Sequence, residues 1–399
     1  MIKPEKVEYI DGKPELGIAI NWDLVRKNFA KIVPAQYRKK YHNALDAFPE
    51  KYSYYIDISD RDRGKTTNKI IAAMIVFAMY GVNMVYMRTK ADDIERRSIR
   101  TMFDSILENG YIQKIFGEPW NSIDYSSYRW TICAVDESGK ITEKMQPFFG
   151  IALATEKAMR YKSRLVLPRG DFIIYDEFIE PEYPSYTMEY FQQNLKTVLR
   201  SRESGIILMS SNAINLNSPW FSDFKIRSKI KNLKAGEHAE IDVDGTTFYC
   251  EILPEDKRTE KKQYNKKYLG FADQALQSIS GRGVWEMKQY PHIKKEFRDC
   301  KILARNLYVL HLGDLLNISI AIVPELGLCG LVRPATKTYK DSIIFTVGEI
   351  LDNRYVYRIG NSNAPTALLW RLYRENRLFY ATNECGELLR NYYTTAQKL

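Results

Sequence analysis

The sequence predicts an α/β fold. We expect a parallel sheet with flanking helices in residues 1–225, a basic linker or small subdomain in residues 226–292, and a smaller α+β domain in residues 293–399. Apolar runs of strand length alternate with helical apolar spacing in the first part, which is typical of a parallel sheet, and the density of Lys and Arg rises after it. At 399 residues with 45% hydrophobic content, the chain is long enough for two or three domains.

The first predicted unit runs strand, loop, helix, strand. Residues 52–58 (YSYYIDI) alternate in a β-rich pattern, and residues 65–81 (KTTNKIIAAMIVFAMYG) have helical apolar spacing that ends at a glycine. Residues 82–89 (VNMVYMRT) are again strand-like. This is a βαβ unit, and the tripeptide Gly-Lys-Thr stands at its strand-to-helix turn.

The later elements of residues 1–225 continue the alternation. In chain order they are a helix in 90–110, short strands in 128–135 and 146–154, a strand in 171–178 that ends in two carboxylates, a helix in 186–204 and a strand in 205–212. No repeat or low-complexity tract interrupts the sequence.

After residue 225 the pattern changes. Two segments that are dense in Lys and Arg, 225–238 and 254–268, flank a hairpin predicted in 239–253 by its Asp244-Gly245 turn. The last domain is predicted to be strand-rich, with strands in 302–312, 318–324, 327–334 and 354–360, a helix in 365–379 and another helix near the end.

Composition excludes several classes of protein. No run is long and apolar enough for a membrane span, and the first residues lack the apolar stretch of a signal peptide, so we expect a cytosolic protein without a membrane partner. Five cysteines without CxxC spacing and only four histidines argue against a disulfide framework or a structural zinc. The net charge of +10 favours a polyanionic partner, although many basic proteins bind no nucleic acid.

Gly64-Lys65-Thr66 is the end of a phosphate-loop motif. In such loops backbone N–H groups surround the β-phosphate, the lysine bridges the β- and γ-phosphates, and the hydroxyl binds Mg²⁺. Lys65 and Thr66 would fill those last two roles. The strict pattern fails at Ser59, which stands where its first glycine should be, and the tripeptide alone is common by chance.

Asp176 and Glu177 follow a buried-strand run. In this arrangement the first carboxylate holds Mg²⁺ through water and the second polarises the attacking water. An acidic cap after a core strand is the alternative. The Gly-Lys-Thr upstream and the intervening α/β pattern favour an ATPase over that alternative.

Two further groups have both a functional and an ordinary interpretation. Ser211 and Asn212 end a strand beside the predicted phosphate site, where a polar side chain can sense the γ-phosphate, and they are also ordinary turn residues. Arg200 and Arg202 close a predicted helix, where cations complement the helix dipole. The alternative is an arginine finger that reaches a neighbouring subunit's site.

Together these residues resemble the DNA-packaging ATPases of φ29-type tailed phages, a branch of the terminase-like motor ATPases in the ASCE P-loop class. The resemblance covers about residues 50–225, and it rests on the order and spacing of the motifs SDRDRGKT, MVYMRTK, ATEK, FIIYDEFIEPE and TVLRSRESGIILMSSNAINLNSPWF. It implies an ATP- and Mg²⁺-dependent motor that translocates double-stranded DNA through the portal into the prohead. It also implies an RNase H-like carboxy-terminal domain that has lost its nuclease.

The resemblance implies a role for each matched residue. The nucleotide is bound by the phosphate loop and the start of the helix: Ser59, Asp60, Arg61, Asp62, Arg63, Gly64, Lys65, Thr66 and Thr67. Thr66 and Asp176 hold Mg²⁺, Glu177 is the catalytic carboxylate, and Arg61 is the arginine within the loop. Arg200 is the finger acting in trans, Asn212 and Ser211 form the coupling motif, and Lys157 of ATEK is a candidate contact to the neighbouring subunit.

This chain departs from the family pattern at Ser59 and Asp62, where relatives have glycine. A loop without these glycines is less free to adopt positive φ, and Asp62 brings a negative charge near phosphates. Arg61 and Arg63 can offset that charge.

The resemblance also implies partners and a place of action. The chain is expected to form a ring of five copies on the portal, or connector, of an empty phage head, with a packaging RNA as a further candidate partner. It is expected in the host cytoplasm, docked transiently on the prohead, and absent from the mature virion.

Two other functions stay open. One is a complete terminase large subunit with nuclease activity, but the predicted strands 302–312 and 318–324 carry no Asp or Glu inside them, and two-metal cleavage needs such carboxylates. The other is a non-hydrolysing ring or DNA-binding adaptor whose glycine-poor loop no longer binds nucleotide.

Overall fold

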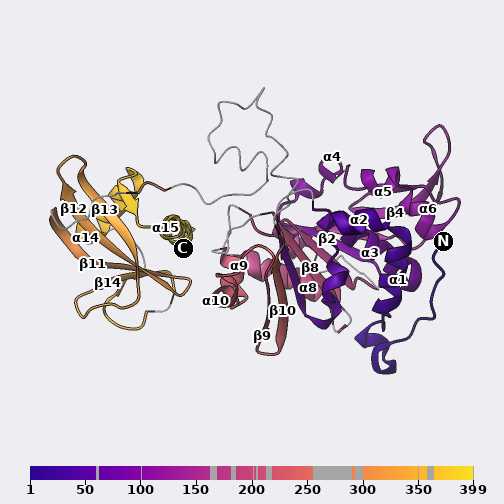
Figure 1. Cartoon of the computed structure of the whole chain (residues 1–399), viewed down its shortest axis with the longest axis horizontal. Coiled ribbons are helices and arrows are strands. Elements are labelled where there is room, and N and C mark those ends of the chain that lie inside the picture. The colour runs from indigo at the N-terminus through magenta and orange to yellow at the C-terminus, as the bar shows by residue number, and fades with distance from the viewer. Residues whose placement is uncertain are drawn as a thin grey trace. The chain divides into compact units, whose positions relative to one another are not determined.

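The computed structural model describes the chain apart from residues 60–62, 100, 162–168, 181–185, 201, 204, 213–217, 255–289, 293–299, 349, 357–363 and 399. The chain divides into two compact units (Figure 1). The first consists of Met1–Leu216 and Asp223–Trp285, and the second of Asn217–Ser222 and Glu286–Leu399. In the described part of the chain, no helix has the length and apolar character needed to cross a membrane.

The first unit is built on one ten-stranded sheet in the order β3-β4-β6-β2-β7-β8-β1-β10-β9, with β5 paired to β4. Its parallel part consists of β6 (Gly150–Ala154), β2 (Met84–Arg88), β7 (Phe172–Asp176), β8 (Ile206–Ser211), β1 (Tyr54–Ile58) and β10 (Thr246–Ile252). The antiparallel strands are β3 (Ser122–Ser126), β4 (Arg129–Val135), β5 (Ile141–Lys144) and β9 (His238–Val243). The predicted α/β class with a large parallel sheet is confirmed.

The hairpin that we expected in a separate linker belongs to this sheet. β10 pairs in parallel with β1 and antiparallel with β9, so the sheet extends past the strand before the phosphate loop. The reason is the apolar face of β10, on which Phe248, Cys250 and Ile252 alternate and are all buried. The Phe248 ring lies 5.0 Å from the Tyr54 ring of β1, and an isolated hairpin would leave this face in water.

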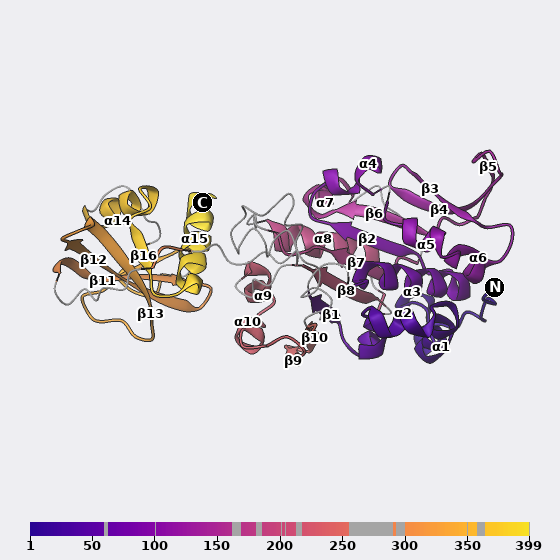
Figure 2. The same cartoon turned by 45° about the horizontal axis from the view of Figure 1, so that its top comes forward.

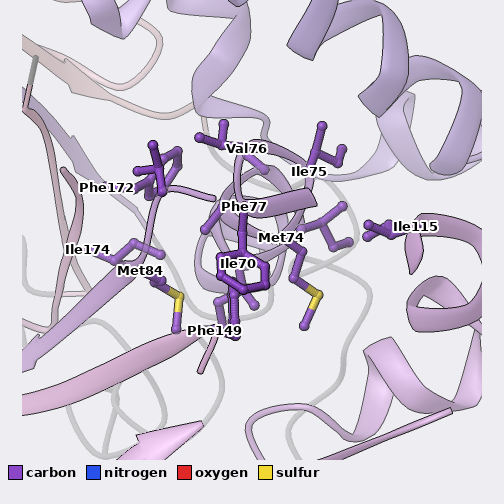
Figure 3. Close-up of a cluster of buried hydrophobic side chains, with 14 of the residues drawn as sticks. Ile70, Met74, Ile75, Val76, Phe77, Met84, Ile115, Phe149, Phe172 and Ile174 are labelled. Carbon is purple, nitrogen blue, oxygen red and sulfur yellow. The ribbon is translucent and has the colours of Figure 1, made fainter. Parts of the chain in front are cut away.

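The helix α3 (Lys65–Tyr80) fills the centre of the first unit. Its apolar side chains pack with Met84 of β2, Phe172 and Ile174 of β7, and Phe149 (Figure 3). The opposite face of the sheet is covered by α8 (Thr187–Leu199), whose Phe191 ring stacks 5.5 Å from that of Tyr175. Figure 2 shows the two helices on either side of the strands. Successive side chains of β7 therefore point alternately to the two faces of the sheet and are buried on both, which explains its continuous apolar run.

The remaining helices of the described chain up to β9 are short. The α-helices are α1 (Trp22–Ile32), α2 (Ala35–Lys40), α4 (Arg96–Ile99), α5 (Asp104–Glu108), α6 (Tyr111–Phe116), α7 (Ala158–Tyr161), α9 (Pro219–Asp223) and α10 (Arg227–Ile230). The 3₁₀ helices are η1 (Ile10–Gly12), η2 (Pro14–Leu16), η3 (Ala44–Ala47), η4 (Pro49–Lys51), η5 (Asp92–Ile94) and η6 (Thr155–Lys157).

The single helix expected in residues 90–110 is divided into η5, α4 and α5. Ile94, Ile99 and Phe103 are all buried, although the first two are five residues apart. One regular helix keeps residues three or four apart on one face, so the chain breaks to bury all three.

The second unit has a six-stranded sheet in the order β15-β14-β11-β12-β13-β16. Its elements are β11 (Lys301–His311), β12 (Asp314–Val323), β13 (Gly327–Ala335), β14 (Ile343–Thr346), β15 (Tyr355–Val356), α14 (Ala364–Arg374), β16 (Leu378–Tyr380) and α15 (Asn383–Lys398). Strand residues Val309, Ile318 and Val332 pack with Leu369 of α14 and Leu389 of α15 in one buried cluster. The described part of this unit is thus strand-rich, and α14 and α15 pack on its sheet.

Candidate nucleotide-binding site

The loop between β1 and α3 ends at Gly64, which has φ of +73° and caps the helix. A Cβ atom at this position would lie 2.7 Å from the Cβ of Tyr41, so both the backbone angle and the space require glycine. Ser59, at the other end of the loop, is buried, and its N–H donates to the Ser211 carbonyl at 3.1 Å. Asp60, Arg61 and Asp62 lie outside the described residues.

Lys65 turns back from the start of α3 toward the ends of β1 and β8. Its Nζ donates to the carbonyl of Ser211 at 2.9 Å and to that of Ser59 at 3.3 Å. It also donates to Asn212 Oδ1 at 3.1 Å. The side chain is buried, and burial lowers the pKa of Lys65 to about 8. The ammonium group therefore donates only to neutral oxygens at the carboxyl edge of the sheet. An anion would bind it more strongly than these oxygens do.

Thr66 and Asp176 meet although 110 residues separate them in the chain. Thr66 Oγ1 donates to Asp176 Oδ1 at 3.0 Å, and the Tyr86 hydroxyl donates to Asp176 Oδ2 at 2.9 Å. One hydroxyl and one carboxylate at the mouth of a phosphate loop are oxygen ligands of the kind that Mg²⁺ takes together with phosphates and water. The residues present therefore fit that ion.

Glu177 follows Asp176 with φ of +49°, a backbone angle that few non-glycine residues adopt. Both carboxylate oxygens are bound: Oε1 accepts from Asn212 Nδ2 at 2.9 Å and Oε2 from Arg88 NH2 at 2.6 Å. Asn212 therefore joins Lys65 to Glu177. Five of the predicted site side chains converge on this edge because β1, β7 and β8 are neighbours and end there; they are Lys65, Thr66, Asp176, Glu177 and Asn212.

Comparison with solved structures finds similar folds. The Phi-28 gp11 DNA packaging motor matches with a TM-score of 0.52 and 16% identity, over 90% of this chain and 98% of that chain. The bacteriophage Phi-29 viral genome packaging motor assembly matches with a TM-score of 0.50 and 17% identity, over 88% of this chain and 99% of that chain. The chain shares the fold of phage DNA-packaging motors. No family model matches the sequence, and no curated protein does.

Within this packaging-motor fold, sequence reasoning missed Arg88. It stands at the end of β2, and its guanidinium lies between the two site carboxylates, 2.6 Å from Glu177 Oε2 and 3.7 Å from Asp176 Oδ2. Burial alone would lower its pKa, but the nearby Asp176 and Glu177 charges and the Tyr86 hydroxyl raise it. The sequence signal that could have indicated Arg88 is a charged residue directly after the buried run VYM.

The sequence reasoning also missed a buried ion pair beneath the loop. Lys69 lies one helical turn after Lys65, and its Nζ is 2.5 Å from Asp57 Oδ2 on β1. Burial by itself would raise the pKa of Asp57, but the Lys69, His42 and Lys65 charges outweigh it and lower that pKa. Lys69 Nζ also donates to Ser210 Oγ on β8, so this one ammonium joins α3 to two strands.

The predicted finger residue lies at the other edge of the same sheet. Arg200 caps the end of α8, is exposed, and has φ of +55°. Arg202, two residues on, is buried in an ion pair with Asp171, which directly precedes β7. β7 has five residues, which separates Arg200 from the carboxyl edge by about 16 Å.

The other predicted residues occupy less distinctive positions. Lys157 follows β6 at the carboxyl edge, is half-buried, and lies 3.8 Å from Glu156. Thr67 is half-buried in the first turn of α3, and Arg63 accepts a backbone hydrogen bond from His42 at 2.9 Å. No group of three or more metal-ligating His, Cys, Asp or Glu side chains occurs among the residues that the structure describes.

Proposed function

We propose that this chain is an ATP-driven motor that moves double-stranded DNA through the portal into a phage prohead. The carrying observation is the convergence of Lys65, Thr66, Asp176 and Glu177 at the carboxyl edge of a parallel sheet. The fold likeness over about nine-tenths of the chain supports the assignment, since both matched proteins are named as packaging motors.

ATP is proposed to bind with its phosphates over the start of α3. Lys65 would leave the Ser59 and Ser211 carbonyls for the β- and γ-phosphates, exchanging neutral acceptors for charged ones. Thr66 and Asp176 would hold Mg²⁺, which when bound supplies positive charge to the phosphate oxygens. The N-terminus of α3 adds its unpaired N–H groups and dipole to the same site.

Hydrolysis is proposed to use Glu177 to orient a water for in-line attack and to accept its proton. In the described state Glu177 is tied to Arg88 and to Asn212. Each carboxylate oxygen accepts one of these hydrogen bonds and keeps a second lone pair, with which it can bind a water and take its proton. Because Asn212 also binds Lys65, displacement of Lys65 by phosphate alters the same group that restrains Glu177. Arg61 would add a further cation at the phosphates.

Arg200 is proposed to act on a neighbouring subunit, within a ring that we propose to be a homopentamer docked on the portal. The side chain is exposed at the edge of the sheet opposite its own Glu177. It therefore needs a second copy of the chain to meet transferring phosphate. Lys157 is a second candidate for such a contact. A packaging RNA is a further proposed partner, which the net charge of +10 would suit.

We infer that the second unit is an RNase H-like domain without nuclease activity. Its strand order β13-β12-β11-β14-β15, with three antiparallel strands followed by two parallel ones, supports that fold. The central strand β11 carries Lys and Arg but no Asp or Glu, and cleavage would need a carboxylate there. A plasmid-nicking assay with Mn²⁺ tests this; nicking by the purified chain would favour a complete terminase.

The central test compares ATP hydrolysis by the wild-type chain and by Lys65→Ala, with and without double-stranded DNA. We expect DNA to stimulate the wild type, and stimulation to fall steeply with added salt because the grip is on phosphates. Equal hydrolysis by Lys65→Ala would overturn the proposal. If calorimetry detects no ATP binding by the wild type, the chain is a non-hydrolysing adaptor instead.

A further inference from the structure

One residue outside the nucleotide site is tied to both sides of the junction between the phosphate loop and α3. The N–H of His42 donates to the Arg63 carbonyl at 2.9 Å, and the His42 carbonyl accepts from Asn68 Nδ2 at 2.6 Å. Arg63 is the next-to-last residue of the loop, and Asn68 lies in the first turn of α3. A shift of the His42 backbone therefore moves the junction at which the phosphates would bind.

The imidazole of His42 is bound in turn to β10. Its Nε2 lies 3.2 Å from Glu251 Oε1 and 2.6 Å from the Tyr55 hydroxyl, which itself donates to Glu251. A carboxylate only accepts, so His42 Nε2 carries the proton in this arrangement. Asp57, which pairs in register with Glu251, lies 3.7 Å away and is already bound to Lys69.

The contacts of His42 thus form one path from strand to loop. Its side chain and that of Glu251 are largely shielded from water, with 14% and 16% exposure, so their direct contact and the hydrogen bonds that join them through the Tyr55 hydroxyl are stronger than surface contacts. Glu251 is the next-to-last residue of β10, and β10 is the last described strand before the chain passes to the second unit. Neither His42 nor Glu251 has a predicted role in nucleotide chemistry.

We propose that His42 is a positioning residue that couples β10 to the phosphate loop through Glu251. The proposal rests on the proposed nucleotide-binding function. When phosphates bind at the start of α3, they hold Arg63 and Asn68 in place, and through them His42, whose imidazole holds Glu251 and the end of β10. By linkage, a displacement of the end of β10 weakens nucleotide binding to the same extent that bound nucleotide stabilises the end of β10. The path gives the motor a mechanical connection between its ATP site and the strand leading to its other domain.

The test measures two quantities in each variant: the equilibrium Kd for ATPγS, and amide hydrogen exchange in residues 246–253 with and without ATPγS. In the wild type we expect ATPγS to slow exchange at the end of β10. His42→Leu should bind ATPγS about tenfold more weakly and lose the exchange response, because it loses the hydrogen bond to the Tyr55 hydroxyl and the contact with the Glu251 carboxylate. Glu251→Ala should do the same, and the double variant should add little more.

Two controls separate positioning from general loss of structure. His42→Gln keeps a donor near the same position and should restore most of the affinity and the response. His238→Leu makes the same substitution in β9, the strand that pairs with β10. Its ring is exposed and packs on Tyr249, and the variant should behave as wild type. Should His42→Leu fail to fold, Glu251→Ala makes the same test.

The results distinguish the two proposals. Wild-type Kd and wild-type exchange response in both His42→Leu and Glu251→Ala would overturn the positioning role while leaving the ATP site intact. A wild-type chain that binds no ATPγS would overturn the proposed function, and the positioning role with it. An equal loss in His42→Gln and His42→Leu would also count against the role, since the donor would then not matter.

Discussion

Arg88 NH2 donates to Glu177 Oε2 at 2.6 Å, while Asn212 Nδ2 binds the other oxygen of the same carboxylate at 2.9 Å. The proposed catalytic carboxylate is therefore held at both oxygens, by Arg88 at the end of β2 and by Asn212 directly after β8. Its backbone angle, with φ of +49°, is of the kind that surrounding contacts must maintain. The orientation of Glu177 thus depends on side chains that do not themselves touch phosphate in the proposed mechanism.

Replacing Arg88 is expected to impair turnover rather than binding. In Arg88→Gln the Glu177 carboxylate loses its charged partner and its orientation, which should lower kcat for ATP about a hundredfold. The Kd for ATPγS should change little, because Lys65 and Thr66 keep their contacts. Steady-state hydrolysis and calorimetry measure the two values. The control Lys90→Gln removes a half-exposed cation paired with Glu180 nearby and should leave kcat unchanged. An unchanged kcat in Arg88→Gln would contradict the role of Arg88 in orienting Glu177.

Nucleotide binding is expected to take up protons above pH 8. Burial lowers the pKa of Lys65 to about 8 in the empty site, from an ordinary value of 10.5. Phosphate charge favours protonated lysine and raises that pKa again, so ATP affinity should fall as pH rises through 8. Calorimetry at pH 9 in two buffers of different ionisation enthalpy measures the uptake. Lys65→Arg stays charged and should lose it; equal uptake in that variant would assign the protons to another group.

Removing one member of the Asp57–Lys69 pair is expected to destabilise the first unit. Asp57→Asn leaves a buried ammonium without its counter-charge, which should lower the free energy of unfolding by about 3–5 kcal/mol. Urea unfolding measures the loss. In the double variant Asp57→Asn/Lys69→Met neither member of the pair carries a charge, and much of the loss should be recovered. A double variant as unstable as Asp57→Asn would contradict this electrostatic explanation.

Substitutions at Arg200 and Arg202 are expected to affect different properties: the first lowers ATPase activity and the second lowers stability. Arg200→Ala removes an exposed side chain and should unfold like the wild type, yet lose ATPase activity in the assembled ring by about a thousandfold if it stabilises transferring phosphate. Arg202→Ala breaks the buried pair with Asp171 and should be destabilised.

Mixing subunits tests whether Arg200 acts in trans. Arg200→Ala has an intact Glu177, and Glu177→Gln has an intact Arg200. A mixture should therefore regain part of the activity that each lacks alone. Lys196→Ala, an exposed cation one turn earlier on α8, is the matched control and should keep full activity. Failure of the mixture to regain any activity would favour a role within one subunit.

The parallel core was predictable because its signals are local. The alternating run before the loop, the apolar helix after it, and the two carboxylates after a buried strand each follow from neighbouring residues. The expected helix in residues 90–110 was wrong because helical composition was read without its burial requirement, and Ile94 and Ile99 are spaced too far apart for one face. β10 was misplaced because only pairing with β1 reveals where its apolar face is buried.

The sequence by itself determined the βαβ core and placed polar residues after three of its strands, since periodicity and strand ends can be read along the chain. Only the tertiary structure decided which of those ends are neighbours. It brought Arg88 to Glu177 across 89 residues and His42 to Glu251, and it kept Arg200 at the opposite edge. The physical reason is that hydrogen bonds and ion pairs depend on distance in space, which strand order sets and no local pattern encodes.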